Sequence, residues 1–111
     1  MSERNQTLAA NVRESLRMVI DPELGENVVD LGLIYRAEVE EGGVACIEMT
    51  TTTRACPATD YLKDAVQSAA WVVPGIHYVE VSLTYEPTWA PEMMNDVARR
   101  RLGLAETGGR T

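Results

Sequence analysis

The stretch IYRAEVEEGGVACIEMTT, residues 34–51, decides the fold because it contains two strand-like segments joined by a tight turn. Apolar and charged side chains alternate over residues 35–40, which is the pattern of a strand with one buried face. Gly42 and Gly43 follow, and glycine adopts positive φ at little cost. A mostly apolar run from Val44 then continues to Thr51. Residues 34–51 therefore predict a β-hairpin.

Helical patterns lie on both sides of this hairpin. Apolar residues recur at helical spacing over residues 8–20, and Asp21-Pro22 ends the pattern because proline disfavours helix at the residue before it. A second helical pattern covers residues 62–73 and stops at Pro74-Gly75. We expect an amphipathic helix in each place, and an extended segment at Val28-Val29.

The remaining chain predicts one strand and one helix. Residues 79–85 alternate most cleanly between apolar and polar side chains, and Pro87 ends this strand. A last helix is expected to end at about Arg101. The order helix, hairpin, helix, strand, helix indicates an α+β fold. We predict a two-layer sandwich in which helices cover one face of a small mixed sheet, built from the hairpin and a right-handed βαβ crossover.

Composition limits the domain organisation and the partners. With 111 residues and 45% hydrophobic content, the chain fits a single domain over residues 1–103, followed by a flexible tail over residues 104–111. Seventeen acidic and ten basic residues give a net charge of −7, which argues against nucleic acid as a partner. No leader-like start and no bilayer-length apolar run is visible, so we expect a cytoplasmic protein with reduced thiols and no membrane partner.

The two cysteines have different contexts. Cys46 lies inside the second strand of the hairpin, where a buried, inert thiol is the expected reading. Cys56 follows a threonine-rich loop and precedes Pro57, a residue type that often opens a helix. A thiol at the helix N-terminus has a lowered pKa, and Arg54 favours the thiolate further. Cys56 is therefore the candidate reactive cysteine. With one histidine, His77, in the chain, neither a single-subunit zinc site nor a cysteine hydrolase is supported.

Two acidic turns precede the hairpin, and each has two interpretations. Asp21, Glu23 and Asp30 occur in segments typical of ordinary turns, in which a short acidic side chain bonds to nearby backbone. Alternatively, Asp21 or Glu23 folds toward the Cys56 loop and acts as a proton acceptor, an oxygen ligand or an orienting group for the threonines. The sequence does not decide between these interpretations.

A C-terminal segment also has two interpretations. Trp89, Met93 and Met94 lie after Pro87 and around Pro91. An aromatic ring and two thioethers indicate core packing or an adaptable surface for a partner.

Five motifs in one order resemble a known family. They are Asp21-Pro22-Glu23, the segment from Asp30 to Tyr35, the threonine run into Cys56-Pro57, Pro74-Gly75, and the segment from Pro87 to Met94. Together they resemble the SufT/PaaD-like metal-sulfur cluster biosynthetic family over about residues 12–103. The resemblance implies an iron-sulfur cluster assembly domain with a reactive cysteine at Cys56. It also implies a site that joins the acidic turn to the cysteine loop, carried over to Asp21, Glu23, Leu24, Thr51 and Thr52.

The expected function is an accessory role in iron-sulfur protein maturation, closer to an assembly factor than to a turnover enzyme. No tightly bound cofactor is expected, only a transient iron-sulfur cluster held through Cys56. Clusters usually take four protein ligands, so a homodimer or a partner would supply the others. The expected partners are the assembly machinery and client apo-proteins. One alternative is a non-catalytic adaptor. A role in phenylacetate degradation is the other, although the chain lacks the cysteine-rich segment of those relatives.

Overall fold

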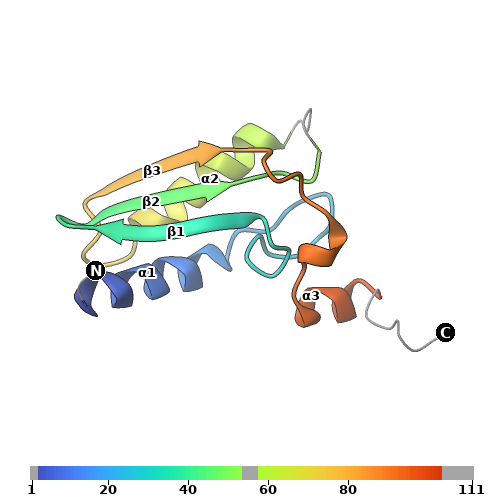
Figure 1. The fold of residues 1–111 in the computed structure, drawn as a ribbon, viewed down its shortest axis with the longest axis horizontal. Helices are drawn as coiled ribbons and strands as arrows, with labels where there is room; N and C mark the ends of the chain where they lie inside the picture. Colours follow the sequence, from blue (N-terminus) through green and yellow to red (C-terminus); the bar gives the residue numbers. More distant parts are fainter. Residues whose placement is uncertain (1–2, 54–57, 104–111) are drawn as a thin grey trace.

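A three-stranded sheet and two helices form the two layers of the molecule (Figure 1). The computed structural model describes residues 3–53 and 58–103. In chain order its elements are α1 (Glu3–Leu16), β1 (Ile34–Glu40), β2 (Val44–Met49), α2 (Thr59–Trp71), β3 (Tyr78–Leu83), the 3₁₀ helix η1 (Pro91–Met93) and α3 (Asp96–Arg101). α1 contacts β1, α2 contacts β3, and the two helices contact each other. The predicted α+β class is confirmed.

The sheet has the predicted mixed pairing, in the order β1-β2-β3. β1 and β2 are antiparallel, whereas β2 and β3 are parallel and connected through α2. The hairpin turn uses Gly42 at φ 87° and Gly43 at φ 75°, as the sequence predicts. A Cβ atom on Gly43 would lie 2.3 Å from the carbonyl oxygen of Gly75. The double-glycine turn therefore also lets the crossover connection pack closely against the hairpin.

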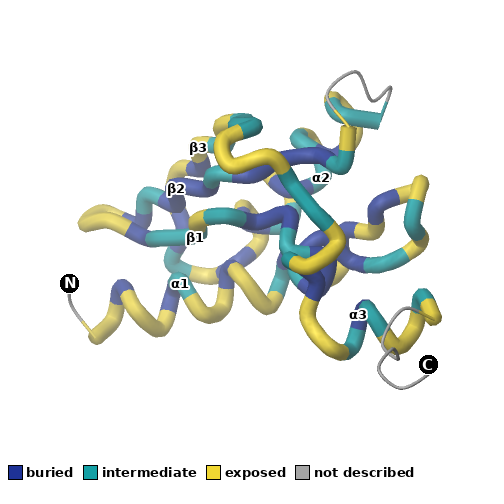
Figure 2. The backbone as a smooth tube through the Cα atoms, turned by 45° about the vertical axis from the view of Figure 1, so that its right-hand side comes forward, coloured by how far each residue is buried: buried dark blue, intermediate teal, exposed yellow. Residues whose placement is uncertain are grey.

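The core lies between the sheet and the two long helices. Buried positions concentrate along the strands and on the inner sides of α1 and α2 (Figure 2). The fully buried large apolar side chains come from α1, the segment between α1 and β1, β1, β2 and α2: Val12, Leu16, Val28, Leu31, Leu33, Val39, Ile47, Met49, Leu62 and Val66. Since each Leu, Ile or Val contributes about 1.5–3 kcal/mol on burial, this cluster is the main stabilising feature of the fold.

Two predictions fail between α1 and β1. The first helix ends at Leu16 instead of near Ile20, because the amides of Arg17, Met18 and Val19 bond three residues back and tighten the last turn. Residues 28–29 are a turn, not an extended segment. The Asn27 side chain accepts a hydrogen bond from the Asp30 amide at 2.9 Å, and such local side-chain bonds compete with strand formation.

The C-terminal region also differs from the prediction. β3 ends at Leu83, two residues earlier than expected, because Thr84 and Glu86 bond to each other locally. The expected last helix is two short pieces, η1 and α3, separated at Asn95. Asn95 is the N-cap of α3, and its side-chain oxygen accepts from the Ala98 amide at 3.0 Å.

The predicted tail at 104–111 lies outside the described residues, so the proposed domain boundary stays a prediction. Within the described part of the chain, no helix combines the length and the apolar character needed to cross a bilayer.

Candidate functional site

The threonine loop begins where β2 ends, at the carboxyl end of the parallel strand pair. The amide of Thr50 donates to the Leu33 carbonyl at 2.9 Å. On the other side, the amide of Thr84 donates to the Met49 carbonyl at 2.9 Å, just after β3 ends. The loop is thus fixed between the turn that precedes β1 and the segment that follows β3. Ligand sites commonly form at this edge of sheets with parallel strands.

Thr51 is held in place by hydrogen bonds on both sides. It is buried, and its hydroxyl donates to the Thr53 carbonyl at 2.6 Å. The hydroxyl of Tyr85 lies 2.9 Å from the same Thr51 oxygen. Because a threonine hydroxyl has one proton to donate, Tyr85 is the donor in this second bond. The buried hydroxyl group of Thr51 therefore fixes the geometry of the loop.

Asp21 shapes the acidic turn. Its carboxylate is buried and accepts hydrogen bonds from the amides of Glu23, at 2.7 Å, and Leu24, at 3.4 Å. The Gly25 amide donates to the Asp21 carbonyl at 2.7 Å. These bonds match the ordinary turn interpretation of Asp21. Leu24 packs against the hydrophobic core and anchors the turn from the other side.

Glu23 joins the acidic turn to the threonine loop. The hydroxyl of Thr52 donates to a carboxylate oxygen of Glu23 at 3.3 Å, across 29 positions of sequence. One end of the sheet thus brings together four of the predicted site residues: Glu23, Leu24, Thr51 and Thr52. Asp21 holds the turn that carries the first two. The sequence does not decide whether the acidic turn approaches the threonine loop, and the bond between Glu23 and Thr52 shows that it does.

Arg54 and Cys56 lie outside the described residues, so the helix N-terminal position of the thiol stays a prediction. The helix itself begins later than the Cys56-Pro57 sequence predicts, because the N-cap of α2 is Ala58 and its first residue is Thr59. Over the described residues, no side chain caps this helix start, and the Thr59 hydroxyl is buried with no hydrogen-bond partner. The first-turn amides of a helix attract negative charge when they lack a cap.

Asp30 connects three distant segments. It is only 2% exposed and accepts hydrogen bonds from Arg17 at 2.5 Å, Asn27 at 2.9 Å and Asn95 at 2.7 Å. Burial by itself raises the pKa of this carboxyl group, but the bonds from Asn27 and Asn95 and the charges of Arg17 and Arg101 lower the pKa below its ordinary value. Asp30 is therefore a structural anion that attaches α3 to the turn before β1.

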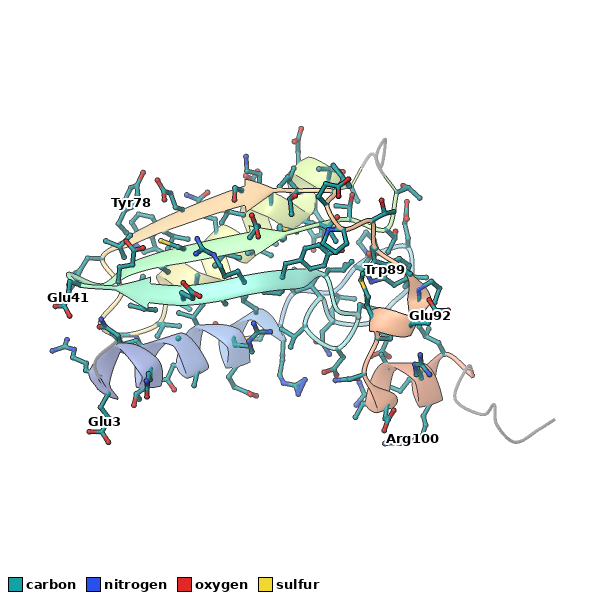
Figure 3. The ribbon with its side chains drawn as sticks, viewed as in Figure 1. Glu3, Glu41, Tyr78, Trp89, Glu92 and Arg100 are labelled. Carbon is teal, nitrogen blue, oxygen red and sulfur yellow. The ribbon has the colours of Figure 1, made fainter. Side chains whose placement is uncertain are left out.

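The predicted partner surface is largely occupied by internal packing. Met94 is buried in the core, and the indole N–H of half-buried Trp89 donates to the Leu31 carbonyl at 2.8 Å. The half-buried Met93 sulfur lies 3.5 Å from the hydroxyl of Tyr35, which also donates to the Pro87 carbonyl at 2.7 Å. The core-packing interpretation fits Met94, and Trp89 serves mainly to attach its segment (Figure 3).

Cys46 behaves as the sequence predicts. It is buried in β2, and burial, with the charges of Glu40 and Glu80, raises the pKa of its thiol. No group of three or more histidine, cysteine, aspartate or glutamate side chains is placed to hold a metal ion in the part of the chain that the structure describes.

Sequence reasoning missed several residues of this region. Tyr85 bonds to Thr51 from 34 positions away along the chain. Arg17 and Asn95 bond to Asp30 from 13 and 65 positions away. Each occupies a place where the pattern suggests only a strand end, a helix end or a loop. The one local signal was the Asn27 and Asp30 spacing, which is typical of a side-chain-stabilised turn.

A model of the family described as iron-sulfur cluster assembly protein matches residues 9–83. The chain is 39% identical over 88 residues to the Fe-S protein maturation auxiliary factor SufT of Staphylococcus aureus, covering 79% of this chain and all of that protein. It is also similar to an iron-sulfur cluster carrier protein of Deinococcus radiodurans, with 42% identity over 60% of this chain and 19% of the carrier.

The fold has a close match among solved structures. The crystal structure of a DUF59 domain from Bacillus anthracis aligns with a TM-score of 0.86 and 32% identity, covering 91% of this chain and 96% of that chain.

Proposed function

Because the chain belongs to the iron-sulfur cluster assembly protein family, we propose that it is an accessory factor in iron-sulfur protein maturation that acts through Cys56. The observation that carries this proposal is the hydrogen bond from Thr52 to Glu23, which joins the acidic turn to the loop leading to Cys56. The loop ends at a helix start that no described side chain caps. These features support a site for an anionic sulfur group at this edge of the sheet.

In the proposed mechanism the Cys56 thiolate is one ligand of an iron-sulfur cluster that passes through as cargo. Thiolate sulfur is the ligand that iron-sulfur clusters prefer. Because Cys56 is one ligand, the other ligand positions of the cluster are open to the donor protein, the recipient protein or a second copy of this chain. The cluster is then released when ligands of the recipient replace the Cys56 thiolate. Glu23 orients Thr52, and Thr51 holds the loop in register. The partners in this proposal are a cluster scaffold and client apo-proteins in the cytosol, a compartment that keeps thiols reduced.

The test replaces Cys56 with serine in cells that depend on this protein. We expect the cluster occupancy of a client iron-sulfur enzyme to fall to the level of a deletion strain, because an alcohol does not replace a thiolate as a cluster ligand. Cys46→Ala is the matched control, since its buried thiol lies in the sheet and is expected to leave occupancy unchanged. Full occupancy in the Cys56→Ser strain contradicts the thiol mechanism and leaves the adaptor role. Anaerobic reconstitution of both variants with iron and sulfide then checks for cluster absorption and dimer formation.

A second prediction tests the junction between the two loops. Glu23→Ala and Thr52→Val each remove the hydrogen bond from Thr52 to Glu23, at a stability cost below about 1 kcal/mol because the contact is exposed. We expect each variant to lower client occupancy several-fold, with the double variant no worse than either single one. Thr53→Val is the control, because Thr53 contacts the Thr51 hydroxyl through its backbone carbonyl, which the substitution keeps. Additive losses in the double variant would show that Glu23 and Thr52 act separately.

A further inference from the structure

The sheet has a second face, opposite α1 and α2, that the proposed function does not use. Because side chains alternate along a strand, the residues between the core positions point to this face. In the register of the sheet, Glu38, Cys46 and Glu80 form one row across the three strands. Arg36, Glu48 and Ser82 form the next row. We call this the open face; Arg36, Glu80 and Ser82 are exposed on it.

The open face is strongly acidic. Glu38, Glu40, Glu48 and Glu80 bring four negative charges against one positive charge from Arg36, a net of −3. Arg36 already binds Glu38 at 3.2 Å, which leaves the other three carboxylates without that cation. Like charges gathered on one sheet face repel each other and lower the stability of the free protein. A cationic partner would relieve this repulsion.

The open face also has a shape that suits a side chain. A hollow of about 400 Å³ lies over the sheet, lined by Arg36, Cys46, Ile47, Glu80, Val81 and Ser82. The raised pKa of Cys46 keeps its thiol neutral, so the floor of the hollow is uncharged. Glu80 is the acidic side chain of this lining, with Arg36 and Ser82 beside it, and the floor is apolar. A lysine or arginine that pairs with Glu80 matches this arrangement through its charged tip and its aliphatic stem.

An aromatic pair links the start of β3 to the end of α2 beside the open face. Tyr78 is 52% exposed at the start of β3 (Figure 3). Its ring meets that of Trp71 edge to face, with centroids 6.2 Å apart. Trp71 is itself 45% exposed. Tyrosine and tryptophan are enriched at the energetic centres of interfaces, and their ring faces attract cations.

We propose that the open face docks a lysine- or arginine-rich segment of a partner protein, with one cationic side chain beside Glu80 in the hollow above Cys46 and the segment continuing over the other carboxylates of the face and Tyr78. A second copy of this chain is a poor occupant because each copy carries a net charge of −7. The surface is separate from the threonine loop and does not depend on the chemistry of Cys56.

The experiment measures binding of a fluorescein-labelled amphipathic lysine/leucine peptide by anisotropy. In the Glu40→Lys/Glu80→Lys variant we expect binding at least tenfold weaker than in wild type. The Glu3→Lys/Asp64→Lys variant has the same net charge, with both changes on exposed helix positions, and is expected to bind within about twofold of wild type. Tyr78→Ala should weaken binding about fivefold without changing the charge. Equal weakening by the two charge-reversal variants, or no binding by wild type, overturns the proposal.

Cys46 provides a second measurement at the same surface. In a Cys56→Ser background, Cys46 is the single thiol and lines the hollow. Its alkylation by iodoacetamide is slow because the thiol is buried and its pKa is raised, and the rate reports on access through the hollow. We expect saturating peptide to slow this reaction several-fold, and an unchanged rate would place the peptide elsewhere and overturn the proposal. Circular dichroism confirms that each variant is folded. A shift of the protein to a dimer under the same conditions would assign the face to a second copy instead, which also overturns it.

Discussion

A Gly32→Ala variant is expected to lose at least about 3 kcal/mol of unfolding free energy, a large part of the stability of a small domain. Gly32 has φ 79°, a left-handed conformation that costs an alanine about 1–2 kcal/mol. A Cβ atom there would also lie 2.4 Å from the carbonyl oxygen of Met93. That contact is with backbone, so the variant must move η1 away from the turn before β1.

Gly25→Ala separates the two causes of this loss. Gly25 has φ 75°, but a Cβ atom would meet no other atom within 4 Å. We therefore expect Gly25→Ala to cost only the backbone strain, about 1 kcal/mol. Urea unfolding followed by circular dichroism measures both variants. If they lose equal stability, close packing of Gly32 against Met93 is not what requires glycine.

The elements that the sequence predicts correctly are those with local causes. The alternation in residues 35–40, the Gly42-Gly43 turn and the Pro74-Gly75 stop each act within a few residues, so the hairpin and α2 appear where they are expected. The end of α1 is different. Just after its last turn, Arg17 bonds to Asp30, 13 positions further along the chain. A contact at that separation produces no periodic pattern in the sequence.

The same distinction applies to the candidate site. The acidic turn and the threonine loop were both identified from their residue types, and the resemblance to the iron-sulfur cluster assembly family, which the comparisons confirm, indicated that they meet. Periodicity could not show that Glu23 reaches Thr52 or that Tyr85 reaches Thr51, because those bonds depend on how the segments before β1 and after β3 pack at one end of the sheet.

The turn before β1 organises that end of the molecule. Three successive residues of this turn contact the C-terminal segment. The Asp30 carbonyl accepts a hydrogen bond from the Asn95 amide, and the Leu31 carbonyl accepts one from the Trp89 indole. Gly32 allows the backbone of Met93 to approach closely. The next residue, Leu33, accepts from the Thr50 amide. Damage to this turn should therefore disturb both the C-terminal segment and the candidate site.

Asp30→Ala is expected to cost about 3 kcal/mol at neutral pH, since it leaves the buried Asn27 amide without its acceptor and removes the anchor for Arg17 and Asn95. Glu14→Ala is the matched control. Glu14 binds the same Arg17 guanidinium at 3.4 Å, but its side chain is 78% exposed, so we expect a loss below about 0.5 kcal/mol. Comparable losses in the two variants would mean that Asp30 acts only as a surface charge.

The pH dependence of the Asp30→Ala difference provides an independent check. The folded protein holds the pKa of Asp30 below its ordinary value of 3.8, so the charged carboxylate stabilises the fold. That contribution is fully present above pH 3.8, and it is lost as the pH falls through the lower folded value. The stability gap between wild type and Asp30→Ala should thus be constant near neutrality and become smaller in acid below pH 3.8. A gap that stays constant down to the acid unfolding transition would show that hydrogen-bond geometry, without the charge, accounts for the role of Asp30.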